Sequence, residues 1–418
     1  MKKLDQALLV AINTHNLTLT QNSINELEEL ANAVNITTVS KVIQNLNNVD
    51  PRYYVGSGKL KEIKQIIDDL EINILITDDT LSPTQLRNLE NFLEIQVIDR
   101  SFLILQIFSQ RAQSKQAILE VSLAQKQYLL PRLLGMGKVL SRQGGGSFNA
   151  KGPGETKLEL DRRKLTKEIH MIKQQLIEIK KHRDLTVKKR KNNEVPVVAL
   201  VGYTNAGKSS LMNYFVNHWG SDKTLVLAQD MLFSTIDTKA KRIKRNNSSA
   251  FILIDTVGFI AKLPNELIAS FESTLNDIKS ADLIIHVIDG LDVDPYKVAF
   301  VKNILKILKM EQIPRITVVS KEDLLTKRDI ALSDDYYFIS TETGFNIDVL
   351  LNEIEASIFN DARISSFIIP YDKGYIFNEL KESTTIIESD FLEDGIHVKA
   401  ILSPKAFVRI KSLIDSKN

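Results

Sequence analysis

One stretch of the sequence has the residue types and spacing of a phosphate-binding loop. Residues 202–209 fit the pattern G-x-x-x-x-G-K-[ST], between an apolar run at 197–201 and a helical segment at 210–216. In that context backbone N–H groups surround phosphate oxygens at the start of a helix, Lys208 reaches the β- and γ-phosphates, and the Ser209 hydroxyl binds Mg²⁺. We therefore expect a nucleoside triphosphate and Mg²⁺ to be bound by Gly202, Tyr203, Thr204, Asn205, Ala206, Gly207, Lys208, Ser209 and Ser210.

A second phosphate-sensing element follows 46 residues after Ser209. Asp255-Thr256-Val257-Gly258 comes directly after the apolar run 251–254 and fits D-x-x-G. In this pattern the Asp holds Mg²⁺ through water and the Gly N–H meets the γ-phosphate, so we assign these roles to Asp255 and Gly258. We expect Thr235 to complete the Mg²⁺ coordination when the γ-phosphate is present, with Thr224 and Thr238 as alternatives. Lys208, Thr235 and Gly258 are our candidate catalytic residues.

Two further loops have the residue types that recognise a guanine base. Ser320-Lys321-Glu322-Asp323 resembles N-K-x-D, in which the Asp accepts hydrogen bonds from the guanine edge and the Lys stem lies over the base. Ser320 replaces the usual Asn and loses an amide that would contact the base and hold the phosphate loop. We expect Asp323 to preserve a weakened preference for guanine. Ser340 and Thr341 begin a stretch that matches the S-A-x-x-G loop beneath the base.

The residue after Gly258 is Phe259, where many small GTPases carry a Gln that orients the attacking water. A phenylalanine side chain cannot form a hydrogen bond with water, so the usual positioning group is missing. We expect slow hydrolysis by the chain alone and acceleration by a partner.

The elements around these motifs indicate an α/β protein of 418 residues. Short apolar runs alternate with amphipathic stretches in the N-terminal part. Residues 56–59 contain two glycines and a lysine but do not fit the eight-residue phosphate-loop pattern, so we expect a turn there that leads into a helix at Leu60. Leucine and isoleucine recur at helical spacing on both sides of a glycine-rich segment at 135–154, which predicts an antiparallel helical hairpin. Pro131 predicts a helix end or kink, and the polar, basic run 187–194 predicts a linker. Our predicted domains are an N-terminal α/β subdomain (1–111), the basic helical hairpin with a glycine-rich loop (112–192), a P-loop GTPase domain (193–361) and a small C-terminal α+β domain (362–418).

Composition excludes several classes of chemistry. There is no cysteine, so disulfides and thiolate metal sites are excluded, and the six histidines are too scattered to form a zinc site. No apolar run is long enough to span a membrane. We expect a monomer in the cytoplasm.

The formal net charge of +2 conceals a strong asymmetry. Residues 131–191 hold 17 Lys and Arg against 6 Asp and Glu, a net charge of +11, so the remainder carries −9. We call residues 131–191 the basic arm. A charge concentrated in this way favours a polyanion, and RNA is the natural candidate. The expected RNA contacts are Arg132, Lys138, Arg142, Lys151, Arg162 and Arg163.

Several stretches together resemble the HflX GTPases. They are 198–209, 255–260, the Gly152–Arg163 segment (GPGETKLELDRR), Val97–Arg100 and Gln125–Leu133. The resemblance covers nearly the whole chain; it departs at Ser320 and at Ala150-Lys151, where Asn and Gly-Arg are expected. It implies a GTPase that binds the large ribosomal subunit, brings the hairpin loop to the peptidyl-transferase region, and in its GTP form helps to split stalled or idle 70S ribosomes. Two alternatives stay open: a GTP-dependent assembly factor for the large subunit, and an ATP- or GTP-using RNA-remodelling enzyme.

Overall fold

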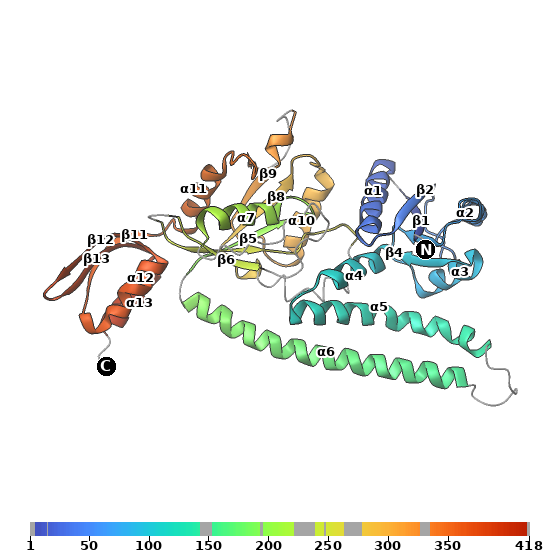
Figure 1. Ribbon diagram of the computed structural model, residues 1–418, viewed down its shortest axis with the longest axis horizontal. Coiled ribbons are helices and arrows are strands. Elements are labelled where there is room, and N and C mark those ends of the chain that lie inside the picture. Colours follow the sequence, from blue (N-terminus) through green and yellow to red (C-terminus); the bar gives the residue numbers. More distant parts are fainter. Residues whose placement is uncertain are drawn as a thin grey trace. The chain divides into compact units, whose positions relative to one another are not determined.

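The computed structural model describes residues 5–14, 16–142, 153–192, 195–220, 239–245, 248–262, 278–326 and 335–415 (Figure 1). Contacts divide the chain into two compact units. The first unit is Met1–Lys180 with Met231–Phe233 and Ile260–Glu272, and the second is Lys181–Asp230, Ser234–Phe259 and Ser273–Asn418. The predicted hairpin therefore groups with the N-terminal sheet as far as Lys180.

The N-terminal sheet of the first unit is fully parallel, with strand order β2-β1-β3-β4. Its elements are β1 (Gln6–Asn13), α1 (Leu17–Ala33), β2 (Thr37–Asn45), α2 (Ser57–Asp69), β3 (Ile74–Thr77), α3 (Pro83–Leu93), β4 (Gln96–Asp99) and α4 (Arg100–Arg111). Helix α3 begins with a capping box, in which the Ser82 hydroxyl and the Gln85 side chain each bond the other's backbone N–H. The glycine–lysine stretch at 56–59 leads into a helix as expected, but α2 begins at Ser57, so only Gly56 precedes the helix.

The two long helices α5 (Lys115–Arg142) and α6 (Pro153–Asn192) lie side by side and run antiparallel (Figure 1). Leu123, Ile169 and Ile172 are buried between them, and Lys126 pairs with Glu168 at 2.6 Å, so the predicted hairpin is confirmed. A helix end at Pro131 and the expected bounds of the glycine-rich loop and the linker were wrong. Helix α5 continues through Pro131 and the first glycines of the predicted loop, and α6 continues through most of the predicted linker to Asn192.

The second unit contains a six-stranded sheet with order β10-β9-β8-β5-β7-β6, in which only β6 is antiparallel to its neighbour. Its elements are β5 (Val197–Gly202), α7 (Lys208–Trp219), β6 (Lys239–Ile243), β7 (Phe251–Asp255), β8 (Leu283–Asp289), α10 (Pro295–Ile307), β9 (Arg315–Ser320), the 3₁₀ turn η1 (Glu322–Leu324), β10 (Tyr336–Phe338) and α11 (Ile347–Ile358). Helices α7 and α11 share one hydrophobic core with the sheet. The central strands are buried on both faces, which is why they are continuous apolar runs in the sequence.

A three-stranded antiparallel sheet, order β11-β13-β12, closes the chain. Its elements are β11 (Arg363–Ile369), the 3₁₀ turn η2 (Tyr371–Lys373), α12 (Gly374–Ser383), β12 (Thr385–Leu392), β13 (Gly395–Leu402) and α13 (Pro404–Asp415). The Lys244 ammonium donates to Lys381 O at 2.6 Å, which joins α12 to the residue after β6 within the second unit.

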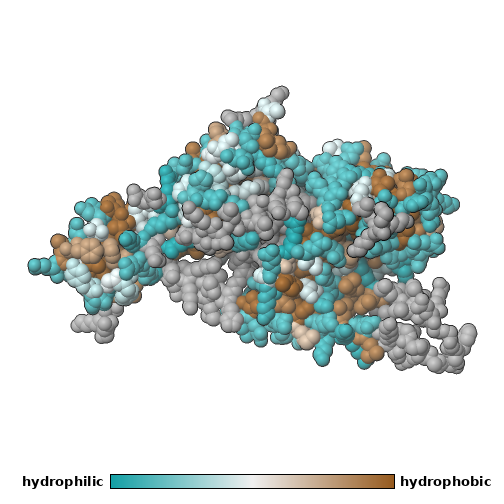
Figure 2. All heavy atoms as spheres, viewed as in Figure 1, coloured by the Kyte–Doolittle hydropathy of each residue, from teal (hydrophilic) through white to brown (hydrophobic). Residues whose placement is uncertain are grey.

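Hydrophobic residues also appear among hydrophilic ones on the surface of this C-terminal sheet and its helices (Figure 2). No helix in the described part of the chain is both long and apolar enough to cross a membrane.

Candidate nucleotide-binding site

The phosphate loop lies at the carboxyl end of β5 and leads into α7. Gly202 has no room for a side chain, because a Cβ there would lie 2.2 Å from Val287 O on the neighbouring strand β8. Gly207 has φ +84° and caps the first turn of α7. Lys208 and Ser209 therefore begin the helix, with the positive end of its dipole at the loop. This is the strand–loop–helix arrangement that we expected from the motif.

Lys208 and Ser209 are buried and face the D-x-x-G segment. The Lys208 ammonium donates to Tyr203 O at 2.7 Å, and the Ser209 hydroxyl donates to Asp255 Oδ2 at 2.7 Å. Burial lowers the pKa of Lys208 to about 8, and the Asp255 carboxylate opposes that shift. A buried ammonium next to a carboxylate and a hydroxyl is suited to a polyphosphate, which would complete its charge pairing.

Backbone hydrogen bonds join the end of the D-x-x-G segment to the phosphate loop. Phe259 N donates to Gly202 O at 3.0 Å, and Thr204 N donates to Phe259 O at 2.8 Å. A Cβ on Gly258 would lie 2.9 Å from Thr204 Cα and 3.1 Å from Lys208 Nζ, so only glycine fits there. Gly258 thus lies next to Lys208, and we expected both residues to contact the γ-phosphate. The Phe259 side chain itself is buried, 6% exposed.

Donor chemistry at the site fits both Mg²⁺ and a triphosphate. The Ser209 hydroxyl and the Asp255 carboxylate are hard oxygen ligands of the kind that Mg²⁺ prefers, and they already contact each other. The Thr204 hydroxyl is buried and, among the described residues, has no hydrogen-bond partner. An orphaned hydroxyl beside Gly258 is satisfied if a phosphate oxygen occupies the space next to it. Thr235 and its alternatives Thr224 and Thr238 lie outside the described residues.

The Ser320 hydroxyl holds the phosphate loop, contrary to our expectation that replacing Asn would lose that contact. Ser320 Oγ lies 2.9 Å from Ala206 O and 3.1 Å from Ile288 O, and its one proton is shared between these carbonyls. The side chain is 4% exposed and packs against Gly207. A shorter side chain therefore preserves the link between the base-recognition loop and the phosphate loop.

The base-recognition loops are bonded to each other as well. The Ser340 hydroxyl donates to Asp323 Oδ1 at 2.6 Å and accepts from the N–H groups of Glu342 and Thr343. Lys321 has φ +57° and pairs with Asp289 at 2.8 Å. Ser340 thus orients the carboxylate that we expected to read guanine. Asp289 was missed in the sequence, because a single Asp at a strand end carries no motif.

Of the residues expected to contact RNA, Arg132 is bonded to other residues of the first unit. Its guanidinium donates to Leu81 O at 2.8 Å, Tyr128 O at 2.8 Å and Asp99 Oδ2 at 3.1 Å, and it stacks on the Tyr128 ring. The side chain is 11% exposed. Arg132 therefore fastens α5 to the N-terminal sheet, and we propose this structural role for it in place of the RNA contact.

The remaining expected RNA contacts divide into two groups. Arg162 and Arg163 are exposed on α6, where Arg163 also pairs with Glu159 at 3.1 Å. Lys151 and the side chains of Lys138 and Arg142 lie outside the described residues. Other cations of α6 share the exposed surface: Lys164, Lys167, Lys173 and Lys180.

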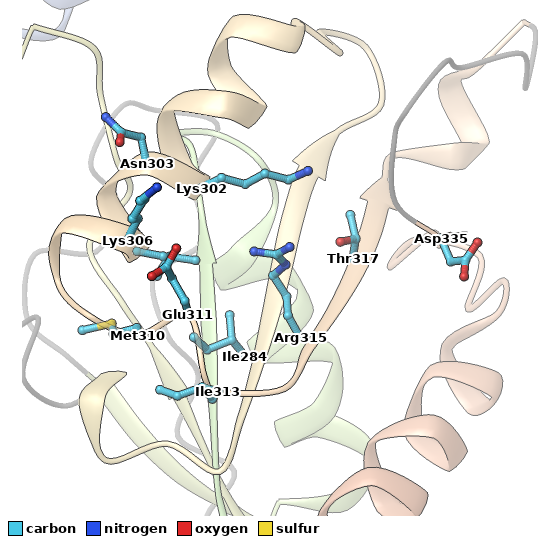
Figure 3. Close-up of a pocket in the computed structure, with 11 residues that line it drawn as sticks. Ile284, Lys302, Asn303, Lys306, Met310, Glu311, Ile313, Arg315, Thr317 and Asp335 are labelled. Atoms are coloured by element: carbon cyan, nitrogen blue, oxygen red, sulfur yellow. The ribbon is translucent and has the colours of Figure 1, made fainter.

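A separate hollow of about 640 Å³ lies at the opposite end of the six-stranded sheet, where β8 and β9 begin (Figure 3). Lys302 and Lys306 of α10 line it together with Arg315 and the acidic residues Glu311 and Asp335. Since the phosphate loop follows the carboxyl end of β5, this hollow is not the nucleotide site.

Family comparisons cover almost the whole chain. Residues 21–109 match the model described as GTP-binding GTPase N-terminal, residues 111–190 match GTP-binding GTPase Middle Region, and residues 197–321 match 50S ribosome-binding GTPase. The chain is 41% identical to the GTPase HflX of Caldanaerobacter subterraneus subsp. tengcongensis, over 99% of this chain and 94% of the relative. It is 34% identical to the GTPase HflX of Escherichia coli, over 88% of this chain and 87% of the relative.

Solved structures of GTP-binding proteins also show a similarity to this chain. One is a GTP-binding protein from the hyperthermophilic archaeon Sulfolobus solfataricus in complex with GDP. It is 23% identical, covers 85% of this chain and 99% of its own, and has a TM-score of 0.43.

Proposed function

We propose that this chain, which belongs to the HflX family of GTPases, binds the large ribosomal subunit through its basic arm and, in the GTP state, splits stalled or idle 70S ribosomes. Its GTPase activity and its association with the ribosome follow from the family. The proposal adds that the large subunit is the binding partner, that 70S splitting is the result, and that the basic arm is the binding surface. It also adds that GTP hydrolysis by the chain alone is slow, that the ribosome stimulates it, and that the chain acts in the cytoplasm.

The observation that supports this proposal is the separation of the two chemistries along the chain. The phosphate-sensing residues Lys208, Ser209 and Gly258 converge at one end of the second unit's sheet. The net charge of +11 lies in the basic arm, whose described cations on α6 are exposed. Such a surface suits the phosphates of ribosomal RNA, and binding should weaken steeply with added salt.

At the nucleotide site the chain's own residues perform three tasks. The N–H groups of the phosphate loop and Lys208 bind the β- and γ-phosphates, and Asp323, oriented by Ser340, selects guanine. Ser209 and Asp255 would hold Mg²⁺, which neutralises charge on the β- and γ-phosphate oxygens. The Gly258 N–H donates to the γ-phosphate. When hydrolysis removes that phosphate, the D-x-x-G segment loses this hydrogen bond.

Phe259 supplies no group that can orient the attacking water. Its backbone joins the phosphate loop and its side chain is buried. We infer that binding to the ribosome helps to order the water, which would account for stimulation of hydrolysis by the ribosome.

Sucrose-gradient analysis of 70S ribosomes tests the proposal. With this protein and a non-hydrolysable GTP analogue, we expect the 70S peak to fall and the protein to sediment with the large subunit. The Lys208→Ala variant, which cannot bind the nucleotide, should leave the 70S peak intact. Binding to immature large subunits without loss of the 70S peak would instead support an assembly factor and refute splitting.

Charge reversal on the exposed face of α6 tests the surface. The double variant Arg162→Glu and Lys167→Glu should weaken ribosome binding while GTP affinity without ribosomes stays unchanged. Lys61→Glu on α2 and Lys309→Glu after α10, both exposed, are matched controls that should bind ribosomes normally. If the α6 variant binds like the controls, the basic arm is not the ribosome-binding surface.

A further inference from the structure

Helix α7 contacts a base-recognition loop as well as beginning in the phosphate loop. Its first residues, Lys208 and Ser209, belong to the phosphate loop, and Tyr214 stands six residues after Lys208 on the same helix. At a rise of about 1.5 Å per residue, Tyr214 lies about 9 Å further along the helix axis. A Cβ on Gly344 would lie 2.7 Å from the Tyr214 hydroxyl oxygen and 3.6 Å from Tyr214 Cζ. Tyr214 therefore packs against Gly344, in the loop 340–344 that we expected beneath the base.

Gly344 closes the turn that carries base-recognition groups. Its N–H donates to Ser340 O at 3.1 Å, and its carbonyl accepts from the N–H of Ile347, the first residue of α11, at 3.2 Å. Its φ of +77° lies in the left-handed region that glycine adopts at little cost. The Ser340 hydroxyl in turn donates to Asp323 Oδ1 at 2.6 Å. A displacement of Gly344 therefore reaches the Asp323 carboxylate through two hydrogen bonds.

Neighbouring side chains hold the Tyr214 ring in place. The His218 ring stacks on it with centroids 4.1 Å apart and an angle of 16° between the planes, and His218 Nδ1 lies 2.8 Å from Tyr214 O. The Trp219 ring tilts against the same ring, with centroids 6.2 Å apart. Tyr214 also packs against the hydrophobic core that α7 and α11 share with the sheet. Because the ring is held from several sides, its hydroxyl limits how closely Gly344 can approach α7.

We propose that Tyr214 is a positioning residue for guanine recognition: it sets the place of the loop 340–344 and, through Ser340, the direction of the Asp323 carboxylate. One helix then binds phosphate at its first turn and supports the base loop from Tyr214, so α7 fixes the spacing between the two halves of the nucleotide site. The inference rests on the proposed selection of guanine by Asp323. All its residues lie in the second unit, and it holds whether or not the chain splits ribosomes.

The experiment measures the affinities of the full chain for GDP, for ADP and for inosine diphosphate, which lacks the exocyclic amine of guanine. Tyr214→Leu keeps an apolar side chain in the core but removes the support for Gly344. We expect the ratio of GDP affinity to ADP affinity to fall about tenfold, with ADP affinity within about twofold of the original. The ratio of GDP affinity to inosine diphosphate affinity should also fall, because a misdirected carboxylate accepts less well from the amine. An equal loss of affinity for all three nucleotides would show that Tyr214 only fills the core, and would overturn the proposal.

A steric test isolates the contact between Tyr214 and Gly344. Gly344→Ala places a Cβ 2.7 Å from the Tyr214 hydroxyl oxygen and also strains the backbone, so this variant should lose the preference for GDP over ADP. When Tyr214→Phe is added, the nearest remaining atom is Cζ at 3.6 Å, an ordinary contact distance. The double variant should therefore regain about threefold in the ratio relative to Gly344→Ala, although Tyr214→Phe alone lowers the ratio by up to about twofold. A double variant that is no better than Gly344→Ala would contradict the proposed contact.

Two further variants complete the comparison. Trp219→Leu is the matched control, because Trp219 is the last residue of α7 and packs against the same core. It should lower the melting temperature without changing the ratio of GDP affinity to ADP affinity. Asp323→Asn removes the carboxylate itself and should abolish the preference for GDP. If Asp323→Asn keeps that preference, the proposed role of Asp323 is wrong and the inference falls with it. If Asp323→Asn loses the preference and Tyr214→Leu keeps it, the inference alone is refuted.

Discussion

Replacing Arg132 separates a structural role from an RNA contact. The Arg132→Met variant keeps an aliphatic side chain but removes the guanidinium, which donates to Asp99, Leu81 O and Tyr128 O and stacks on Tyr128. Asp99 is fully buried but keeps three donors: Leu81 N, Phe102 N and the Tyr128 hydroxyl. The substitution therefore does not leave an isolated buried charge, and the cost is smaller than for breaking a buried pair outright.

The magnitude follows from the lost contacts. One hydrogen bond to a charged group is worth about 1.5–3 kcal/mol, and bonds to the carbonyls and the cation–π contact add roughly 1 kcal/mol each. Allowing for incomplete additivity, we expect a loss of about 3 kcal/mol of unfolding free energy. For a unit of this size that lowers the melting temperature by roughly 6–12 °C.

Thermal unfolding combined with hydrogen exchange of α5 and β4 peptides measures this change. Arg163→Met is the matched control, since Arg163 is 73% exposed and its pair with Glu159 should contribute no more than about 0.5 kcal/mol. Below the melting temperature the Arg132 variant should bind ribosomes normally. A variant with unchanged stability and weakened ribosome binding would refute the structural assignment and restore Arg132 as an RNA contact.

Three further predictions concern the nucleotide site. Because burial sets the pKa of Lys208 to about 8 and a bound phosphate raises it, binding takes up a proton above that pH; GTP affinity should be flat below pH 7 and fall through pH 8–9. Calorimetry in buffers of different ionisation enthalpy measures the uptake, and pH-independent affinity would contradict the reasoning. Ser320→Ala, which removes the link to Ala206 O, should weaken binding of fluorescent GDP about fivefold, or about 1 kcal/mol; an unchanged dissociation rate would show that the link is unimportant. Thr204→Val should leave the melting temperature of the nucleotide-free protein unchanged or higher, because the hydroxyl has no partner among the described residues, but should lower GTP affinity about tenfold relative to GDP. A lower melting temperature with equal affinities would mean that the hydroxyl is structural.

The nucleotide site could be predicted from the sequence because its chemistry is local. The phosphate loop requires its glycines, lysine and serine within eight consecutive positions, and the strand before it is an uninterrupted apolar run. The hairpin was equally accessible, since the residues buried between α5 and α6 recur at helical spacing. Its boundaries were not, because α5 includes Pro131, a residue type that usually ends or kinks a helix.

Roles that depend on distant partners could not be predicted. Charge alone does not distinguish Arg132, which is held by Asp99, from Arg162, which faces solvent. Lys262 has no motif, and the carboxylates with which it pairs lie more than 180 residues earlier. The retained function of Ser320 was missed because the distance from its hydroxyl to Ala206 O is a property of the fold, not of the residue type.

The first unit is discontinuous in sequence, and this imposes an order on its formation during synthesis. Its sheet is complete in the chain by Asp99, and α6 reaches the end of the unit's first segment at Lys180. The lysine that pairs with Asp78 and Asp79 is translated about eighty residues later. Until then the carboxylates of Glu26, Asp78 and Asp79 lack Lys262 and have the guanidinium of Arg100 as the cation paired with Glu26 and Asp78. An excised fragment ending near residue 192 would keep that imbalance permanently, so the unit acquires its full stability only after the second unit's phosphate loop has been made.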